Sequence, residues 1–174
     1  MEFCFETKYD QRGLTVMARA QRKTVRKKHS RRSHIFAWCV VALDVLLLAL
    51  RWRSGTLWSL RGILTLGVGV ILVLALLTED RVNAFAAKKN MLPGVASARC
   101  VFTEDGYTSA TEIAVTEFRY EAVQQICETA DYFVFLLSQH HGQIYDKAAL
   151  RGGTVEEFRT FITEKTGKPV AYIK

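Results

Sequence analysis

The sequence lacks most of the residues and motifs that indicate a disulfide-rich scaffold or a metal centre. Its 174 residues include only four cysteines, two prolines and four histidines, with no Cys-x-x-Cys pair and no histidine at metal-ligand spacing. The cysteines are widely separated, so we interpret them as reduced thiols, which suits a cytoplasmic or intramembrane setting. Internal repeats and low-complexity segments are also missing. These absences argue against a zinc module, a disulfide-stapled domain and a repeat architecture.

Catalytic signatures are equally absent. No Gly-x-Ser-x-Gly, His-Glu-x-x-His or paired Cys/His motif occurs. The "EDG" at 104–106 is turn sequence without the twelve-residue oxygen spacing of a calcium loop, and the "GVG" at 67–69 lacks the strand and helix that flank a phosphate loop. His140 and His141 have only Asp146 nearby as a further ligand, so we interpret them as a solvated turn. We expect neither an enzyme, nor a metal site, nor a cofactor.

Positive charge is abundant in only one place. The chain carries a net charge of +7, and "QRKTVRKKHSRRSH" at 21–34 holds seven of its 24 Lys and Arg residues. Without those seven, 17 basic residues balance 17 acidic ones, so the basicity is local. Beside an apolar run, each such residue adds about 1 kcal/mol of attraction to anionic lipid. We expect contact with lipid headgroups, not nucleic acid, through Arg22, Lys23, Arg26, Lys27, Lys28, Arg31 and Arg32.

Two long apolar runs follow the basic segment. The first, "IFAWCVVALDVLLLAL", has 16 residues and would span about 24 Å as a helix, and Arg51 and Trp52 extend it to a predicted span at 35–52. The second run, at 57–77, has 21 residues and would span about 31 Å, enough for a bilayer core. Because only "RWRSGT" separates them, we predict an antiparallel transmembrane hairpin. A soluble protein with two buried core helices is the alternative.

The distribution of charge predicts the orientation of this hairpin. Lys and Arg are retained on the cytoplasmic side of a membrane, and the flank before Ile35 holds far more of them than the connection with Arg51 and Arg53. Both termini are therefore expected to be cytoplasmic, in a multi-pass protein of the cell membrane. Aromatic side chains prefer the membrane interface. The predicted interface anchors are Trp38, Trp52 and Trp58.

Two charged residues fall inside the predicted spans. Asp44 and Arg61 are at similar depth on antiparallel neighbours, so we expect an intramembrane polar pair. Protonation of Asp44 and a proton or ion pathway are the alternatives. Gly62, Thr65 and Gly69 offer a small-residue face for close packing, either within the hairpin or in a homo-oligomer.

The composition of residues 81–174 predicts a soluble module. Residues 81–174 hold 11 basic and 11 acidic residues, a balance that does not suit a nucleic-acid reader. The segment 97–118 predicts a hairpin that turns at 104–106. The stretch 119–129 suits an edge strand or a short helical turn, and the segment 131–150 predicts two strands around a His-His-Gly turn.

Helices are expected at both ends of this module. "RVNAFAAKKN" at 81–90 predicts a short helix before the "MLPG" breaker. A second helix should begin at Thr154, which with Glu157 has the spacing of a capping box, and should end at Gly167. Its predicted apolar face consists of Phe158, Phe161 and Ile162.

The N-terminal segment completes the predicted architecture. At 1–9, Phe3 and Phe5 alternate with polar residues, which predicts a strand that joins the sheet of the C-terminal module. Residues 10–34 should form a basic juxtamembrane helix. We therefore expect an α+β protein in which a two-helix membrane hairpin is inserted into a small, antiparallel, cytoplasmic β domain.

These features resemble the YcxB-like family of bacterial membrane proteins. The similarity lies in "FETKYD", the two-span hairpin, and "VFTEDGYTS" through "YEAVQQICETADYFVFLL" to "TVEEFRTFI". It extends over nearly the whole chain as a loose pattern that includes Tyr120, Glu128-Thr129 and the aromatic strand of Tyr132, Phe133 and Phe135. The chain departs from the family at Asp146-Lys147, where Pro-Lys is usual. The resemblance implies a pleckstrin-homology-like sheet capped by the C-terminal helix, no enzymatic activity and an undefined molecular role.

Three functions remain open. The architecture favours a non-enzymatic, membrane-anchored interaction or scaffold protein that displays its β domain to an unidentified protein partner. The alternatives are an immunity protein against a toxin or bacteriocin, and a small transporter or channel subunit that uses Asp44 and Arg61.

Overall fold

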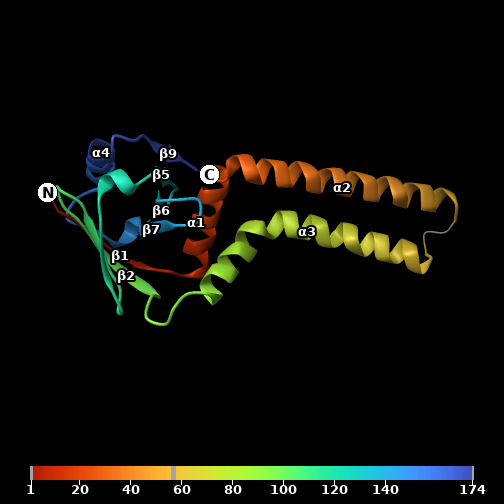
Figure 1. The fold of residues 1–174 in the computed structure, drawn as a ribbon, viewed down its shortest axis with the longest axis horizontal. Helices are drawn as coiled ribbons and strands as arrows, with labels where there is room; N and C mark the ends of the chain where they lie inside the picture. Colours follow the sequence, from red (N-terminus) through yellow and green to blue (C-terminus); the bar gives the residue numbers. More distant parts are fainter. Residues whose placement is uncertain (1, 56–57, 174) are drawn as a thin grey trace. The chain divides into compact units, whose positions relative to one another are not determined.

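The computed structural model describes residues 2–55 and 58–173, which divide into two compact units (Figure 1). The first unit combines the N-terminal segment up to Arg26 with the chain from Asp80 onward. The second unit is the helical hairpin of residues 27–79. The chain thus contributes two distant segments to one mixed α+β unit and inserts two long helices between them.

The first sheet of the mixed unit has five antiparallel strands in the order β4-β3-β2-β1-β8. The predicted N-terminal strand is confirmed, because β1 pairs with β2 from the contact of Phe3 with Phe102 to that of Lys8 with Ser97. The predicted hairpin at 104–106 is also confirmed as the β2–β3 turn. The strands are β1 (Phe3–Lys8), β2 (Ser97–Phe102), β3 (Tyr107–Ala110), β4 (Val115–Phe118) and β8 (Leu150–Arg151).

The second sheet has four strands in the order β7-β6-β5-β9. Its members are β5 (Gln125–Glu128), β6 (Tyr132–Leu136), β7 (Gly142–Asp146) and β9 (Val170–Tyr172). One sequence prediction needs correction here, because the predicted single sheet is two sheets. The short helical turn that was one alternative for the stretch 119–129 is confirmed as a 3-10 turn, η1 (Tyr120–Ala122). The strand that follows it, β5, is internal and not an edge strand, because β9 pairs with it in parallel.

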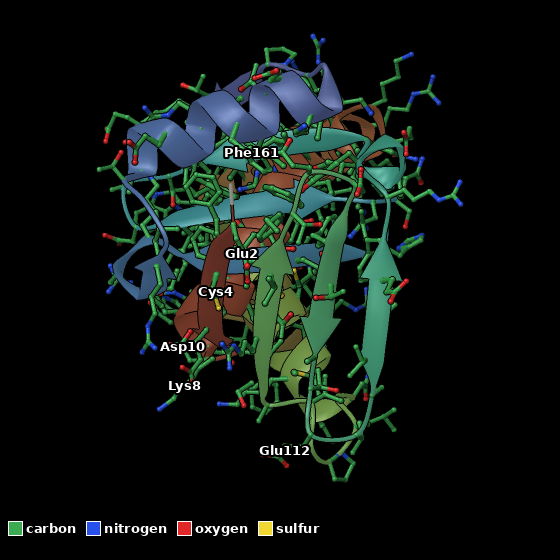
Figure 2. All side chains as sticks on the ribbon, turned by 90° about the vertical axis from the view of Figure 1, so that its left-hand side faces the viewer. Glu2, Cys4, Lys8, Asp10, Glu112 and Phe161 are labelled. Carbon is green, nitrogen blue, oxygen red and sulfur yellow. The ribbon has the colours of Figure 1, made fainter. Side chains whose placement is uncertain are left out.

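The larger core of the mixed unit lies where the two sheets face helix α4 (Val155–Thr166). Phe158 of α4 is fully buried, with its ring centroid 4.7 Å from that of Phe5 and 5.1 Å from that of Phe102. Figure 2 shows α4 crossing one end of the sheets, with Phe161 beneath it. Interlocked aromatic rings of this kind contribute both buried area and specific edge-to-face geometry.

Helix α4 begins and ends as its sequence predicts. The Thr154 hydroxyl accepts a hydrogen bond from the Glu157 N–H, and the Glu157 carboxylate accepts one from the Thr154 N–H, which completes the capping box. Gly167 ends the helix with a φ of 64°, in the left-handed region that favours glycine.

The basic connector differs from the single helix predicted at 10–34. Helix α1 (Gln11–Lys23) is capped by Asp10 and ends at Lys23, and a turn at 24–26 separates it from α2 (Lys27–Arg53). Leu14 on α1 is buried in the mixed unit. The connector is therefore two helices, and the basic residues are divided between them.

The hairpin unit consists of α2 and the first two thirds of α3 (Leu60–Lys89), which run side by side (Figure 1). Both helices are long and apolar enough to cross a membrane, and only 6% of the most apolar window of each is buried. The predicted start of the second span at Leu57 lies outside the described residues, as do Met1 and Lys174 at the ends of other predicted segments.

Helix α3 corrects a further prediction. The sequence suggested a span that ends at Leu77 and a separate short helix at 81–90, but one continuous helix extends to Lys89. The charged "TEDR" marks the end of the apolar surface, not of the helix, because no helix breaker occurs before Pro93 and Gly94.

Candidate functional site

The seven basic residues predicted to contact lipid fall on three structural elements. Arg22 and Lys23 occupy the last turn of α1, Arg26 lies in the turn, and the remaining four are on the first turns of α2. Those four side chains, Lys27, Lys28, Arg31 and Arg32, are all exposed. The beginning of α2 therefore presents a dense group of solvated cations directly before its apolar stretch.

Arg22 has a partner that the sequence did not predict. Its guanidinium donates two hydrogen bonds of 2.7 Å to the carboxylate of Asp80, whose side chain is only 12% exposed. Arg19 lies 3.6 Å from the same carboxylate. A bidentate pair of this geometry holds α1 against the segment of α3 that belongs to the mixed unit. Arg22 thus has a structural role that sets it apart from the exposed cations of α2.

The predicted intramembrane pair does not form. Asp44 lies against Gly69, where an added Cβ would overlap its carboxylate, and no ion pair joins Asp44 to Arg61 within the part of the chain that the structure describes. Arg61 precedes Gly69 by eight positions, or about 12 Å of helix. The helix register therefore places the two charges at different depths.

The three tryptophans of the hairpin are all exposed. Trp38 and Trp52 lie on α2, about 21 Å apart by the helical rise, and Trp58 lies two residues before the start of α3. The spacing along α2 is shorter than the roughly 30 Å thickness of a bilayer core. Exposed tryptophans near the ends of apolar stretches are typical of a membrane interface.

The most strongly connected charge in the mixed unit is Glu128 at the end of β5. Arg159 of α4 donates two hydrogen bonds of 2.7 Å to its carboxylate, and Lys147 donates another of 2.6 Å. Lys147 also donates to the carbonyl of Thr129 and lies over the ring of Phe133. These bonds, Arg159 above all, lower the pKa of Glu128 although its burial opposes the shift. The network joins the second sheet to α4.

The histidine pair forms the predicted turn between β6 and β7. The backbone N–H groups of His140 and His141 both donate to the Ser138 hydroxyl. Among the residues that the structure describes, no group of three His, Cys, Asp or Glu side chains could hold a metal ion.

A polar hollow lies beside the end of β1. It has a volume of about 430 Å³ and is lined by side chains that include Glu6, Lys8, Asp10, Asp146 and Arg151. Asp10 accepts a hydrogen bond from the N–H of Gly13, and Asp146 accepts one from the N–H of Ala148. Both carboxylates therefore serve as caps of helical turns.

An apolar groove opens between the free edges of the two sheets. Strands β4 and β7 are edge strands of different sheets, and both line a groove of about 630 Å³. Its wall includes Leu14 and Met17 of α1 and Met91 after α3, while Ser109 and Gln143 contribute polar groups. Sequence reasoning missed this groove because its residues come from segments up to about 130 positions apart that share no motif.

Comparison with protein families identifies one segment of the mixed unit. Residues 102–162 match the family model described as YcxB-like protein. The predicted resemblance is confirmed over this segment. The N-terminal strand and the hairpin, which the sequence resemblance also included, lie outside the matched residues. No curated protein matches the chain.

The YcxB-like segment contains the whole Glu128 network, since Lys147 and Arg159 both fall inside it. It also contains Asp146. The Asp146 N–H donates to the buried Thr7 hydroxyl at 3.2 Å, a bond that a proline at this position could not make. This hydrogen bond ties β7 to the N-terminal strand β1.

Proposed function

We propose that the protein is a non-enzymatic, membrane-anchored interaction protein of a bacterial cell membrane. In this proposal, α2 and α3 cross the membrane as a hairpin, both termini are cytoplasmic, and the mixed unit is displayed at the cytoplasmic leaflet to a protein partner. We also propose that the mixed unit is pleckstrin-homology-like, which its two sheets and the capping helix α4 support.

The observation that carries the proposal is the exposure of the apolar side chains on both long helices. Only 6% of the apolar window in either helix is buried, whereas a core helix of a soluble protein would be covered on most sides. Apolar surface of this extent is stable in lipid and unstable in water. The hairpin therefore serves best as an anchor.

The charged residues before the apolar stretch supply the orientation. Lys27, Lys28, Arg31 and Arg32 are exposed on α2 immediately before Ile35. Each adds about 1 kcal/mol of attraction to an anionic leaflet, and positive flanks stay on the cytoplasmic side. These cations are the proposed contacts to lipid phosphate.

The mixed unit supports binding better than chemistry. Its most strongly linked charges, Glu128, Lys147 and Arg159, bind one another and join a sheet to a helix. In contrast, the edge strand β4 is exposed and carries Val115 at 70% exposure. An exposed strand edge is a feature that protein partners use, because an extended segment can pair with it.

The topology is tested with two reporter fusions that are active only in the cytoplasm. A fusion after Lys174 should be active, and a fusion inserted after Gly55 should be inactive. Replacement of Lys27, Lys28, Arg31 and Arg32 by Gln should weaken this difference, whereas replacement of Lys88 and Lys89 by Gln is the matched control and should preserve it. An active reporter after Gly55 and an inactive one after Lys174 would overturn the orientation.

The interaction role is tested by photocrosslinking in intact cells. A photoreactive amino acid at Val115 or Tyr172, both exposed on the mixed unit, should yield a discrete crosslinked protein. The same amino acid at the buried Phe158 should not. Absence of a crosslinked protein at every exposed site of the unit would contradict a role in protein binding.

A further inference from the structure

The groove between β4 and β7 has an apolar wall. Its lining carries no charge at neutral pH unless His141 is protonated. Its apolar part comes from α1, the end of α3 with the following loop, and the β3–β4 turn, including Leu14, Met17, Met91 and Ile113. None of the Asp, Glu, Lys or Arg residues of the described chain lines it. Its volume of about 630 Å³ falls within the range of sites for small organic ligands. An uncharged occupant suits this lining, since a buried charge would find no counter-ion.

The floor of the groove carries polar side chains that can donate further hydrogen bonds. Gln143 is only 5% exposed, and its Oε1 accepts a hydrogen bond of 2.6 Å from Tyr145. The amide nitrogen of Gln143 makes no bond to any of the residues that the structure describes. The Ser109 hydroxyl accepts from the Cys100 thiol at 3.4 Å and retains its own proton for donation.

One tyrosine extends this set of donors. Tyr9 lines the groove, and its phenolic hydroxyl is protonated at neutral pH as in any tyrosine; burial raises its pKa further, to about 12. Tyr107 stacks on the groove residue Phe118 with a centroid distance of 5.1 Å. Burial raises the pKa of Tyr107, and its buried hydroxyl makes no hydrogen bond of full geometric quality with any residue that the structure describes. Tyr107 itself does not line the groove, so the donors that line it are Gln143, Ser109 and Tyr9.

We infer that this groove binds an uncharged, single-chain amphiphile, whose chain lies along the apolar wall and whose hydroxyl or carbonyl oxygen accepts hydrogen bonds from Gln143, Ser109 and Tyr9. The lack of charged lining residues excludes a strongly anionic headgroup, and the cluster of donors at one end selects an acceptor oxygen. The membrane is the source of this ligand, and in that respect the inference rests on the proposed anchoring.

The test uses the full chain in lipid nanodiscs that contain a photoreactive monoacylglycerol with a diazirine on its acyl chain. After illumination, labelled peptides are mapped by mass spectrometry. Peptides from α2 and α3 should be labelled by surrounding lipid, and peptides that contain Met17, Met91 or Ile113 should be labelled by groove binding. Unlabelled oleyl alcohol should compete for groove labelling, whereas oleate should compete much less.

Strand β4 provides a matched pair of variants. Thr116 lines the groove, while its neighbour Glu117 does not, and both are exposed. Thr116→Trp should fill the groove and abolish labelling there, while Glu117→Trp should leave it unchanged. Gln143→Leu removes one donor and should weaken competition by oleyl alcohol about fivefold or more. Slow reaction of the buried thiols Cys100 and Cys127 verifies that each variant is folded.

The possible outcomes separate this inference from the proposed function. Labelling of the hairpin without labelling of the groove overturns the groove ligand and leaves the anchor intact. Equal competition by oleate and oleyl alcohol overturns the assignment of an uncharged headgroup. Groove labelling that persists unchanged in Thr116→Trp would show nonspecific adsorption and would also overturn it. Absence of hairpin labelling would contradict the membrane anchor itself.

Discussion

Arg159 and Glu128 form two parallel hydrogen bonds of 2.7 Å each, between Nε and Oε2 and between a terminal guanidinium nitrogen and Oε1. The pair joins the middle of α4 to the end of β5, and Lys147 shares Oε1. Bidentate, charge-assisted bonds fix geometry as well as energy. The Glu128 side chain is 6% exposed, so the loss of either cation would leave its buried negative charge with too little positive charge nearby.

Glu128→Gln should therefore destabilise the mixed unit by about 2–3 kcal/mol. Loss of one partner from a fully buried pair costs about 3–5 kcal/mol, and the cost is smaller here because Arg159 is 38% exposed. Unfolding of the full chain in urea can be followed by labelling of the buried thiols Cys100 and Cys127 in a Cys4→Ser, Cys39→Ser background.

The matched control for this substitution is Glu156→Gln. Glu156 approaches the same Arg159 at 3.7 Å, but its side chain is 76% exposed. Surface pairs contribute little, so this change should stay within about 0.5 kcal/mol. Equal effects of the two substitutions would contradict a special role for the buried carboxylate.

The same carboxylate predicts how stability changes with pH. Hydrogen bonds from Arg159 and Lys147 lower the pKa of Glu128 in the folded state, so between that value and the unfolded pKa of about 4.3 the unfolded chain binds more protons. This contribution is complete above about pH 4.3. It is lost as the pH falls toward the folded pKa.

The free-energy difference between the wild type and Glu128→Gln should accordingly shrink below about pH 4.3. This difference can be measured by urea unfolding at pH 3 to 6, in about half-unit steps. Because thiols are protonated in acid, the buried cysteines are then labelled with a disulfide reagent that reacts at low pH. A difference that stays constant over this range would show that the Glu128 charge contributes nothing to stability.

Local signals in the sequence were sufficient for several elements of the fold. The "EDG" turn, the capping box of Thr154 and the left-handed Gly167 all depend on residues within a few positions of one another. The alternation of Phe3 and Phe5 marked a strand with one buried face, and both side chains are fully buried. Such features follow from backbone and capping chemistry that a short segment contains by itself.

Features that depend on distant residues could not be predicted. Glu128 is 31 positions from Arg159, and Arg22 is 58 positions from Asp80. The parallel pairing of β9 with β5 follows a proline and spans only three residues, so it leaves no periodic pattern. The depth of Asp44 was misjudged relative to Arg61 because the register of two helices depends on which side chains fit together, here Asp44 beside Gly69.

The contact between Asp44 and Gly69 leads to a third prediction. Gly69→Ala would place a methyl group on the terminal oxygen of the Asp44 carboxylate, so the Asp44 side chain must rotate away, at a cost of about 1 kcal/mol for a less favourable side-chain conformation. Asp44→Ala should remove the clash, so that the double variant packs better than Gly69→Ala alone. The coupling between the two positions is then favourable in a double-mutant cycle.

A pair of engineered cysteines measures this coupling. Leu48 and Leu66 line the same apolar recess from opposite helices. In a Cys39→Ser background, Leu48→Cys and Leu66→Cys can form a disulfide in a glutathione buffer. The equilibrium constant of that disulfide gives the effective concentration of one thiol at the other, and its logarithm is a free energy that measures how close the two helices are. Simple additivity of the two substitutions would contradict direct contact between Asp44 and Gly69.

The capping box of α4 allows a last prediction. The Thr154 hydroxyl satisfies the Glu157 N–H at 3.2 Å, so Thr154→Ala should lower the stability of the mixed unit by about 1 kcal/mol. Thr160 lies on the same helix, and its hydroxyl donates only to the carbonyl of Glu156, one turn earlier. Because alanine has the higher helix propensity, Thr160→Ala should be neutral or slightly stabilising. Urea unfolding with thiol labelling compares the two variants directly, and equal losses at both positions would mean that helix propensity, not capping, decides where α4 begins.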